Sequence, residues 1–252
     1  MKTGEYAAMY AVEDSHWWYA GMRRVAGELL RARLACLKGG RTGTLDILDA
    51  GCGTGGNAAY LQEYGRVWGL DVSAEALRFA RRRPGLTLAR GSVDQLPFRD
   101  GSFDLVLSND VLCHLHVADD ERAVAEFARV LRPGGVMYLQ LPAFDRLRSH
   151  HDAAVYTRHR YTDAEVRGLL RRARLRVRRL TYANALLFPA AAAWRLLHKA
   201  GNPEEAEHSD VRPVQPIVNA ALRAALSLEA PVIRRRNLPF GLSVIGVAEK
   251  PR

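Results

Sequence analysis

A glycine-rich turn is the segment of this 252-residue chain whose residue types most clearly indicate ligand binding. An apolar run ends at Asp49, and glycines follow at positions 51, 53, 55 and 56. Glycine has no Cβ, so such a turn after a strand lets backbone N–H groups approach a bound molecule. Asp71, at the end of the next apolar run, is an acid where ribose hydroxyls could bind. The pattern predicts a nucleotide cofactor, but the turn also fits the dinucleotide fingerprint and leaves the cofactor open.

Size and charge restrict the class of protein. The hydrophobic fraction of 48% is ordinary for a soluble globular protein, and 252 residues can bury a sizeable core. The net charge of +10 comes almost entirely from arginine. Because no basic run is interleaved with aromatics, an arginine-rich solvated surface is favoured over a nucleic-acid groove.

Membrane, disulfide and metal signals are weak. No apolar run approaches the roughly 18 residues that a membrane span needs. The three cysteines have no paired spacing, and the eight histidines have no metal-ligand spacing. We therefore expect a cytoplasmic protein with no stable membrane insertion, no disulfide and no bound metal.

Apolar runs and amphipathic segments alternate after the turn. Helices are expected where apolar residues recur at helical spacing or follow an N-cap such as Ser73 or Thr162. The expected strands are 45–49, 66–71, 86–89, 103–108, 136–141, 175–178 and 242–248. The expected helices are 23–37, 57–64, 74–83, 119–131, 163–172, 185–199 and 218–236. This alternation predicts an α/β fold with a seven-stranded, mainly parallel sheet covered by helices on both faces.

Two stretches lie outside that alternation. Residues 1–44 are helical in character and carry a dense aromatic cluster at 16–19. Roughly sixty residues separate the last two expected strands, too many for an ordinary connection. We expect an N-terminal helical lid at 1–44, a core at 45–184, a helical cap insertion at 185–237 with a Pro/Glu-rich linker around 203–216, and the last strand within 238–252.

Four segments in order decide between the candidate cofactors. The loop reads Asp-x-Gly-x-Gly-x-Gly from Asp49, and companion motifs stand at 91–106, 109–115 and 129–135. Together they resemble class I S-adenosylmethionine-dependent methyltransferases that act on small molecules. The resemblance covers residues 45–141. It implies a Rossmann-like, doubly wound fold and S-adenosyl-L-methionine as the cofactor, with S-adenosyl-L-homocysteine as the product.

The resemblance also implies roles for individual residues. Those near the methionine portion and the ribose would be Asp49, Gly51, Cys52, Gly53, Gly55, Asp71 and Val72. Ser92 and Val93 would lie at the adenine edge, and Asn109 would begin the floor beneath the sulfonium. The family usually has an acid where Ser92 stands, so either its hydroxyl or Asp94 would accept from the adenine amino group.

The segment from His16 to Tyr19, followed by Arg23, resembles a helical lid found in part of the family. There an arginine lies near the methionine carboxylate, which would be Arg23 here, and Trp17 would contact the substrate. The alternative is an aromatic staple on the edge of the sheet. The two interpretations are compatible.

Methyl transfer is a displacement at a sulfonium that is already activated, so the protein mainly supplies alignment and a dry site. An oxygen or carbon acceptor can also need a base, most often histidine. Loops gather at the carboxyl ends of parallel strands, which makes the candidate bases His16, His114, His159 and Tyr161. By the same reasoning the substrate-binding candidates are Trp17, Tyr182, Asn184 and the anion-binding pair Arg158 and Arg160.

The function expected from these residues is methyl transfer to oxygen or carbon of a small, anionic and partly apolar metabolite. Specialised metabolites, glycolipids and prenyl phosphates fit that description. The alternatives are an NAD-dependent oxidoreductase, an RNA methyltransferase and a non-methylating cyclase that binds the same cofactor. The segment Asn109-Asp110-Val111-Leu112 lacks the Asn/Asp-Pro-Pro-aromatic signature of nucleic-acid amino methyltransferases, so no nucleic-acid partner is expected. We expect a monomer or a homodimer.

Overall fold

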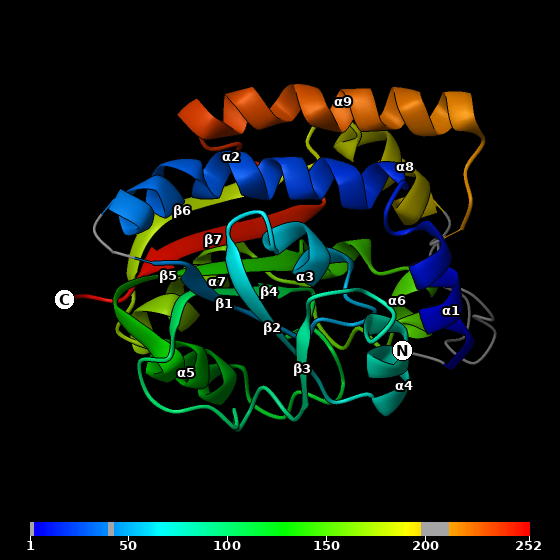
Figure 1. Ribbon diagram of the computed structural model, residues 1–252. Coiled ribbons are helices and arrows are strands. Elements are labelled where there is room, and N and C mark those ends of the chain that lie inside the picture. Colours follow the sequence, from blue (N-terminus) through cyan, green and yellow to red (C-terminus); the bar gives the residue numbers. More distant parts are fainter. Residues whose placement is uncertain (1–2, 40–42, 198–211) are drawn as a thin grey trace.

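A seven-stranded sheet forms the centre of the computed structural model, which describes residues 3–39, 43–197 and 212–252 (Figure 1). Its strands are β1 (Leu45–Ala50), β2 (Gly65–Asp71), β3 (Thr87–Arg90), β4 (Phe103–Asn109), β5 (Leu131–Pro142), β6 (Arg176–Ala183) and β7 (Ser243–Glu249). Their order is β3-β2-β1-β4-β5-β7-β6, and only β7 runs antiparallel to its neighbours β5 and β6. The predicted α/β fold with a mainly parallel seven-stranded sheet is confirmed.

Helices cover both faces of this sheet (Figure 1). They are α1 (Thr3–Val12), α2 (Trp17–Gly39), α3 (Gly56–Leu61), α4 (Ala74–Ala80), α5 (Asp120–Val130), α6 (His150–Ala154), α7 (Asp163–Arg172), α8 (Phe188–Leu197) and α9 (Pro216–Arg235), with a 3-10 turn at Asp145–Leu147. Side chains alternate across each strand, so neighbouring residues enter different cores. Leu48 and Val106 pack with α5 and α7, whereas Ile47 and Leu105 pack with α2, α3 and α9.

The capping signals lie where the sequence places them. The Ser73 side chain accepts a hydrogen bond from the Ala76 N–H at the start of α4. Thr162 and Glu165 form a reciprocal capping box at the start of α7. Both predicted helix starts are confirmed because an N-cap side chain satisfies backbone N–H groups that lack a partner within the helix.

Several element boundaries differ from those expected; β5, for example, begins at Leu131 rather than at 136. Tertiary contacts account for two of these differences. Helix α2 begins at Trp17 rather than at 23, because the Asn219 side chain of α9 accepts from the Trp17 N–H at 2.7 Å and caps the helix. Strand β6 continues to Ala183 rather than ending at 178. Its pairing with β7 shifts register between Val177 and Arg179, which interrupts the alternating pattern that marks a strand in the sequence.

In the described residues, the insertion before β7 contains two helices, which pack against different parts of the protein. Helix α8 lies against the 3-10 turn, and α9 lies along α2 on the outside of the molecule (Figure 1). By length and composition α9 could span a membrane, although no apolar run of that length was expected from the sequence; 22% of its apolar window is buried. The expected linker around 203–216 falls mostly outside the described residues.

Candidate active site

The glycine loop leaves β1 at its carboxyl end and turns into α3. Gly51 and Gly53 have φ values of +86° and +55°, a left-handed conformation that glycine adopts without a steric penalty. The N–H groups of Gly51 and Cys52 donate to the Leu70 carbonyl of β2 at 2.7 and 2.9 Å. These bonds hold the loop against the neighbouring strand.

Asp71 stands at the end of β2 with its carboxylate held by the backbone. One oxygen accepts from the Gly53 N–H at 2.9 Å and the other from the Ser73 N–H at 2.8 Å. Burial raises the pKa of Asp71 above its ordinary value, and the two N–H donors oppose that shift. A carboxylate can accept about four hydrogen bonds, so this group retains capacity for a ligand.

Asp49 is the most deeply buried acid beside the loop, with 1% of its surface exposed. Its Oδ2 atom has no hydrogen-bond partner within the described part of the chain. Burial, together with the Asp71 and Glu13 carboxylates, raises the pKa of Asp49 to about 8. A buried carboxylate without a cation is costly, so a positively charged ligand would stabilise this position.

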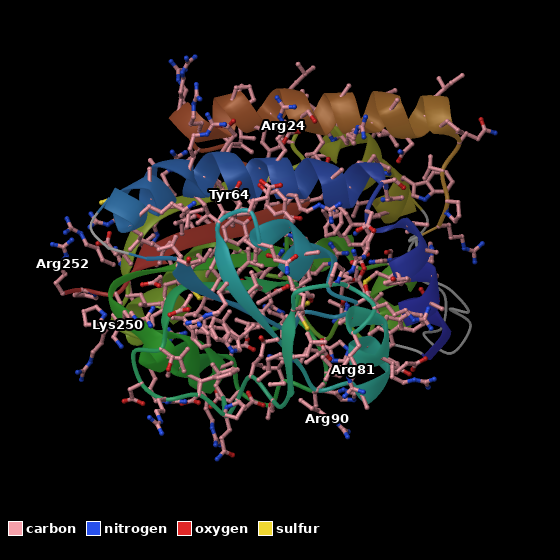
Figure 2. The ribbon with its side chains drawn as sticks, viewed as in Figure 1. Arg24, Tyr64, Arg81, Arg90, Lys250 and Arg252 are labelled. Atoms are coloured by element: carbon pink, nitrogen blue, oxygen red, sulfur yellow. The ribbon has the colours of Figure 1, made fainter. Side chains whose placement is uncertain are left out.

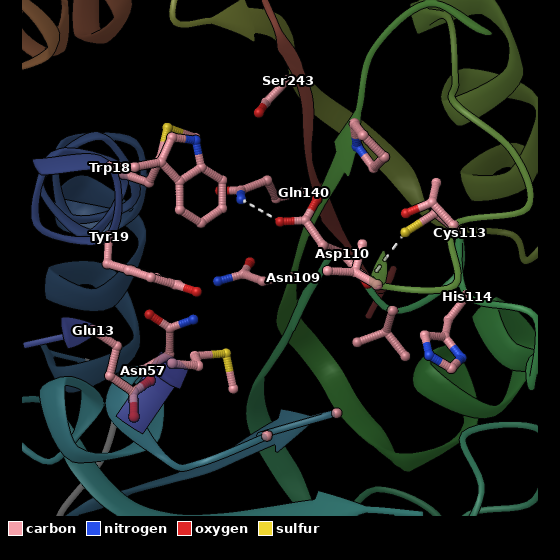
Figure 3. Close-up of a pocket in the computed structure, with 18 of the residues that line it drawn as sticks. Glu13, Trp18, Tyr19, Asn57, Asn109, Asp110, Cys113, His114, Gln140 and Ser243 are labelled. Carbon is pink, nitrogen blue, oxygen red and sulfur yellow. Dashed lines mark hydrogen bonds between the residues drawn. The ribbon is translucent and has the colours of Figure 1, made fainter. Parts of the chain in front are cut away.

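Two more polar side chains follow at the end of β4, where Asn109 and Asp110 lie side by side (Figure 3). The Oδ1 atom of Asn109 is buried and has no partner among the described residues. Asp110 has a φ of 55°, and its carboxylate accepts from Nε2 of Gln140 on β5 at 3.1 Å. Burial raises the pKa of Asp110 to about 6.

Glu13 fastens the N-terminal helices to the glycine loop. Its carboxylate accepts from the Thr54 hydroxyl and, at 2.8 Å, from Nη2 of Arg83. Its backbone carbonyl accepts from Nη2 of Arg23 at 2.7 Å. Only 4% of Glu13 is exposed, so this ion pair is shielded from solvent.

A cavity of about 1040 Å³ lies between these helices, the carboxyl edge of the sheet and α8. Trp18 and Tyr19 of α2 point into it, toward Gln140 and Asn109 (Figure 3). One part of its wall carries predicted cofactor residues, namely Arg23, Gly51, Cys52, Gly53, Asp71, Val72, Ser92 and Val93. Another part is apolar and includes Trp17, Met22, Leu187, Ala191 and Trp194. Ligand pockets usually have about 300–1,000 Å³, so there is room for a nucleotide cofactor and a second molecule.

Residues 48–139 match the family model described as a methyltransferase domain. A probable S-adenosylmethionine-dependent methyltransferase of Mycolicibacterium smegmatis is 36% identical over 142 residues, which cover 56% of this chain and 51% of the relative. Malonyl-[acyl-carrier protein] O-methyltransferase of Pectobacterium atrosepticum is 37% identical over 121 residues, covering 47% and 45%. The matches thus span about half the length of these relatives.

Solved structures agree on the fold. A methyltransferase of Thermotoga maritima, described as a possible histamine N-methyltransferase, has a TM-score of 0.57 at 20% identity over 98% of this chain and 95% of that chain. The family segment at 48–139 contains the glycine loop, Asp71 and Asn109. Residues 48–139 form a methyltransferase domain. The relative named for S-adenosylmethionine favours that cofactor over the dinucleotide that the glycine loop alone would allow.

The methyltransferase domain has residues that fit this cofactor. The Asp71 carboxylate can accept from ribose hydroxyls, and the buried oxygens of Asp49 and Asn109 lack partners in the described residues. Ser92 lines the cavity, whereas the Asp94 carboxylate accepts from the Ala118 N–H at 3.3 Å and is not part of the wall.

Two predicted cofactor residues lie behind the cavity wall. Asp49 is buried before the loop, and Gly55 is the N-cap of α3, where a Cβ would contact Ala80, Arg83 and Leu86. Gly55, with a φ of +88°, therefore shapes the loop without touching the cavity. Asp49 stays a predicted cofactor residue, whose charge would act on the ligand through the loop.

Two of the four predicted catalytic residues, His16 and His114, line the cavity. Burial lowers the pKa of both imidazoles, that of His114 to about 4, so both are neutral at pH 7. The other two lie outside it. The Tyr161 hydroxyl donates to Asp120 at 2.7 Å, and His159 Nε2 lies 2.9 Å from a Glu165 oxygen. Their expected position at the acceptor was wrong.

The expected arginine grip on an anionic substrate is not formed. Arg158 pairs with the Asp120 carboxylate and does not line the cavity. Arg160 does line it, but it is 3% exposed and donates to Asp152 through Nε at 2.8 Å and Nη2 at 3.0 Å. Both arginines are paired with acids inside the protein, Arg158 with an acid 38 residues away and Arg160 with one 8 residues away.

Of the remaining substrate-binding candidates, two line the cavity and one does not. Trp17 and Asn184 line the cavity, whereas Tyr182 stacks on Phe144 at a ring distance of 5.0 Å and donates to Asp163 at 3.2 Å. Asn184 is 1% exposed, and neither polar atom of its side chain has a partner within the described residues. The amide of Asn184 can therefore both donate to and accept from a ligand.

Three residues of the site were missed in the sequence: Glu13, Asp110 and Gln140. Gln140 had a usable signal, because it is an amide within an otherwise apolar strand and is 1% exposed. Asp110 adjoins Asn109 and could have been assigned with it. The pairing of Glu13 with Arg83 joins residues 70 positions apart and needs the tertiary structure.

Proposed function

We propose that this protein transfers the methyl group of S-adenosylmethionine to an oxygen or carbon atom of a small, partly apolar metabolite. The observation that carries the proposal is the single cavity that joins the cofactor residues Gly51, Asp71 and Asn109 to apolar walls. When bound, the cofactor supplies an electrophilic methyl group. The protein aligns the acceptor with it and excludes water.

Apolar side chains from the lid and from α8 would contact the acceptor. Trp17 and Met22 come from α2, Leu187 precedes α8, and Ala191 and Trp194 belong to α8. The relative named for O-methylation of a malonyl group on a carrier protein supports an oxygen acceptor on an acyl-type molecule. Arg158 and Arg160 are already paired with acids, so they do not favour an acceptor that carries an anionic group.

Asp110 is the best-placed base for an acceptor that must lose a proton. Its carboxylate lies at the cavity beside Asn109, and Gln140 holds it at 3.1 Å. With a pKa of about 6 it is mostly ionised at pH 7.5 and still basic enough to accept a proton. His114, whose pKa is about 4, is a weaker base in the same cavity.

Two measurements test this function in sequence. Calorimetric titration with S-adenosylhomocysteine and with NAD should show binding of the first compound alone. Incubation with methyl-labelled S-adenosylmethionine and a panel of acyl, aromatic and prenyl alcohols should then label at least one acceptor. If S-adenosylhomocysteine binds but no acceptor is labelled, the non-methylating alternative would be favoured. If S-adenosylhomocysteine does not bind, the proposal would be refuted.

A further inference from the structure

The outer face of α9 carries an apolar stripe that runs from Ile217 to Val232. Helix α9 packs on α2 through Leu226, Ala230 and Ile233, and its opposite side is open (Figure 1). On that open side Ile217 is 85% exposed and Leu228 is 67% exposed. With 3.6 residues per turn, positions 217, 221, 224, 228 and 232 form one stripe, occupied by Ile, Ala, Ala, Leu and Val.

Arginines lie beside this stripe, and α9 has no exposed acidic side chain. Arg223, Arg235 and Arg236 are exposed and form no ion pair within the described residues. Arg24 of α2 lies beside the helix and, with Arg223 and Leu228, lines a shallow depression on it (Figure 2). Glu229, the acid of this helix, is 4% exposed and accepts from the Leu186 N–H at 2.7 Å.

We propose that the outer face of α9 binds an anionic lipid surface. An exposed apolar stripe of this length marks an interaction site, and arginines beside it attract anionic headgroups. The contact is peripheral, because Leu226, Ala230 and Ile233 hold the helix on α2. The binding does not depend on the methyl-transfer proposal.

The charge distribution favours lipid over a second copy of the chain. Two α9 faces packed about a twofold axis would bring like-charged arginines together, and such juxtapositions oppose association. Val214 and Leu222, from the N-terminal part of this segment, also line the cavity. A lipid surface on α9 would thus lie near the route by which an apolar acceptor enters.

Co-sedimentation of the full-length protein with vesicles tests the proposal. The protein should bind phosphatidylcholine vesicles that contain phosphatidylglycerol and should bind pure phosphatidylcholine weakly, and salt at 0.5 M should reduce binding through screening. Arg223→Ala with Arg235→Ala should weaken binding on the order of 25-fold, and Leu228→Glu should reduce it to the level seen with neutral vesicles.

Matched controls keep folding and net charge out of the comparison. Arg81→Ala with Arg252→Ala removes the same charge far from α9 (Figure 2), and Leu115→Glu changes a leucine that is 58% exposed elsewhere. Both controls should bind like the parent, and all variants should unfold at the parent's temperature. Equal binding to the two kinds of vesicle, or a stable dimer in light scattering that Leu228→Glu dissociates, would overturn the proposal.

Discussion

Asp49 is a buried carboxyl whose ionisation opposes folding of the cofactor-free protein. Its pKa of about 8 lies above the value of about 3.9 for an unfolded chain, so the folded state binds the proton more tightly. The stability contributed by this proton is complete below pH 4 and is lost as the pH rises through 8. Asp49→Asn should therefore raise the Tm at pH 8, by about 2–4 °C for each kcal/mol gained, in scanning calorimetry.

The same substitution should weaken binding of S-adenosylhomocysteine about tenfold at pH 8, since it removes a negative charge that would attract the ligand's ammonium group through the loop. Isothermal titration measures this effect. Asp100→Asn, at a side chain that is 80% exposed, is the control and should change neither quantity. A D49N protein less stable than the parent at pH 8 would show that the Asp49 charge is compensated in the folded state.

Asp110 and His114 lead to different expectations about the pH dependence of catalysis. If Asp110 is the base, the rate constant at saturating cofactor should rise with pH through about 6. Asp110→Asn should lower this rate constant about 100-fold and leave S-adenosylhomocysteine affinity within twofold. The comparison uses the first acceptor found in the labelling panel. A larger loss with His114→Gln would assign the base to the imidazole instead.

Helix α1 and the start of α2 act as one element because Glu13 joins them to the glycine loop. Glu13→Gln removes the charge that pairs with Arg83, whose side chain is only 10% exposed. Breaking a shielded pair on one side should lower the free energy of unfolding by about 3 kcal/mol. Hydrogen exchange should accelerate in α1 more than in β1, and S-adenosylhomocysteine should dissociate faster.

An exposed ion pair provides the comparison for Glu13. Glu121 and Arg172 are 58% and 54% exposed, so Glu121→Gln should change stability by less than about 0.5 kcal/mol. In E13Q the shielded Arg83 keeps only the exposed Asp14 as an acidic partner within the described part of the chain, at 3.0 Å. The variant E13Q/R83M should recover part of the lost stability, because this shielded charge is removed as well. Unchanged exchange in α1 of E13Q would mean that other contacts hold the lid.

For the molecule as a whole, one arginine joins three strands at the edge opposite the cavity. Arg132 donates to Asp104 at 2.6 Å and to Asp46 at 2.8 Å. Burial alone would raise the pKa of Asp46, but Arg132 and Arg66 lower it below its ordinary value. A lowered carboxyl pKa stabilises the fold above the unfolded pKa, and that stability is lost as the pH falls through the folded value.

Arg132→Met should therefore destabilise the protein most at neutral pH and less in acid. Urea unfolding at pH 7 and at pH 3.5 measures the difference. Cofactor affinity should stay within twofold, because none of Arg132, Asp46 and Asp104 lines the cavity. A uniform loss of stability at both pH values would indicate lost packing rather than lost charge pairing.

Local signals in the sequence were sufficient for most of the fold. Glycines at positive φ, the N-caps Ser73 and Thr162, and apolar runs act within a few residues of where they stand. They located the loop, two helix starts and the order of strands and helices. The start of α2 could not be placed, because its cap comes from Asn219, 202 residues away.

The sequence by itself determined the cofactor half of this protein, and the tertiary structure decided the acceptor half. The cofactor loop depends on backbone geometry that consecutive residues impose, so its motifs can be recognised in the amino-acid sequence. Whether an arginine or a tyrosine reaches a ligand depends on the partner that it meets. Arg158 and Tyr161 meet Asp120, and Arg160 meets Asp152, so these side chains are satisfied inside the protein. Asp110 and Gln140 became visible as site residues only when the folded chain showed them facing the cavity.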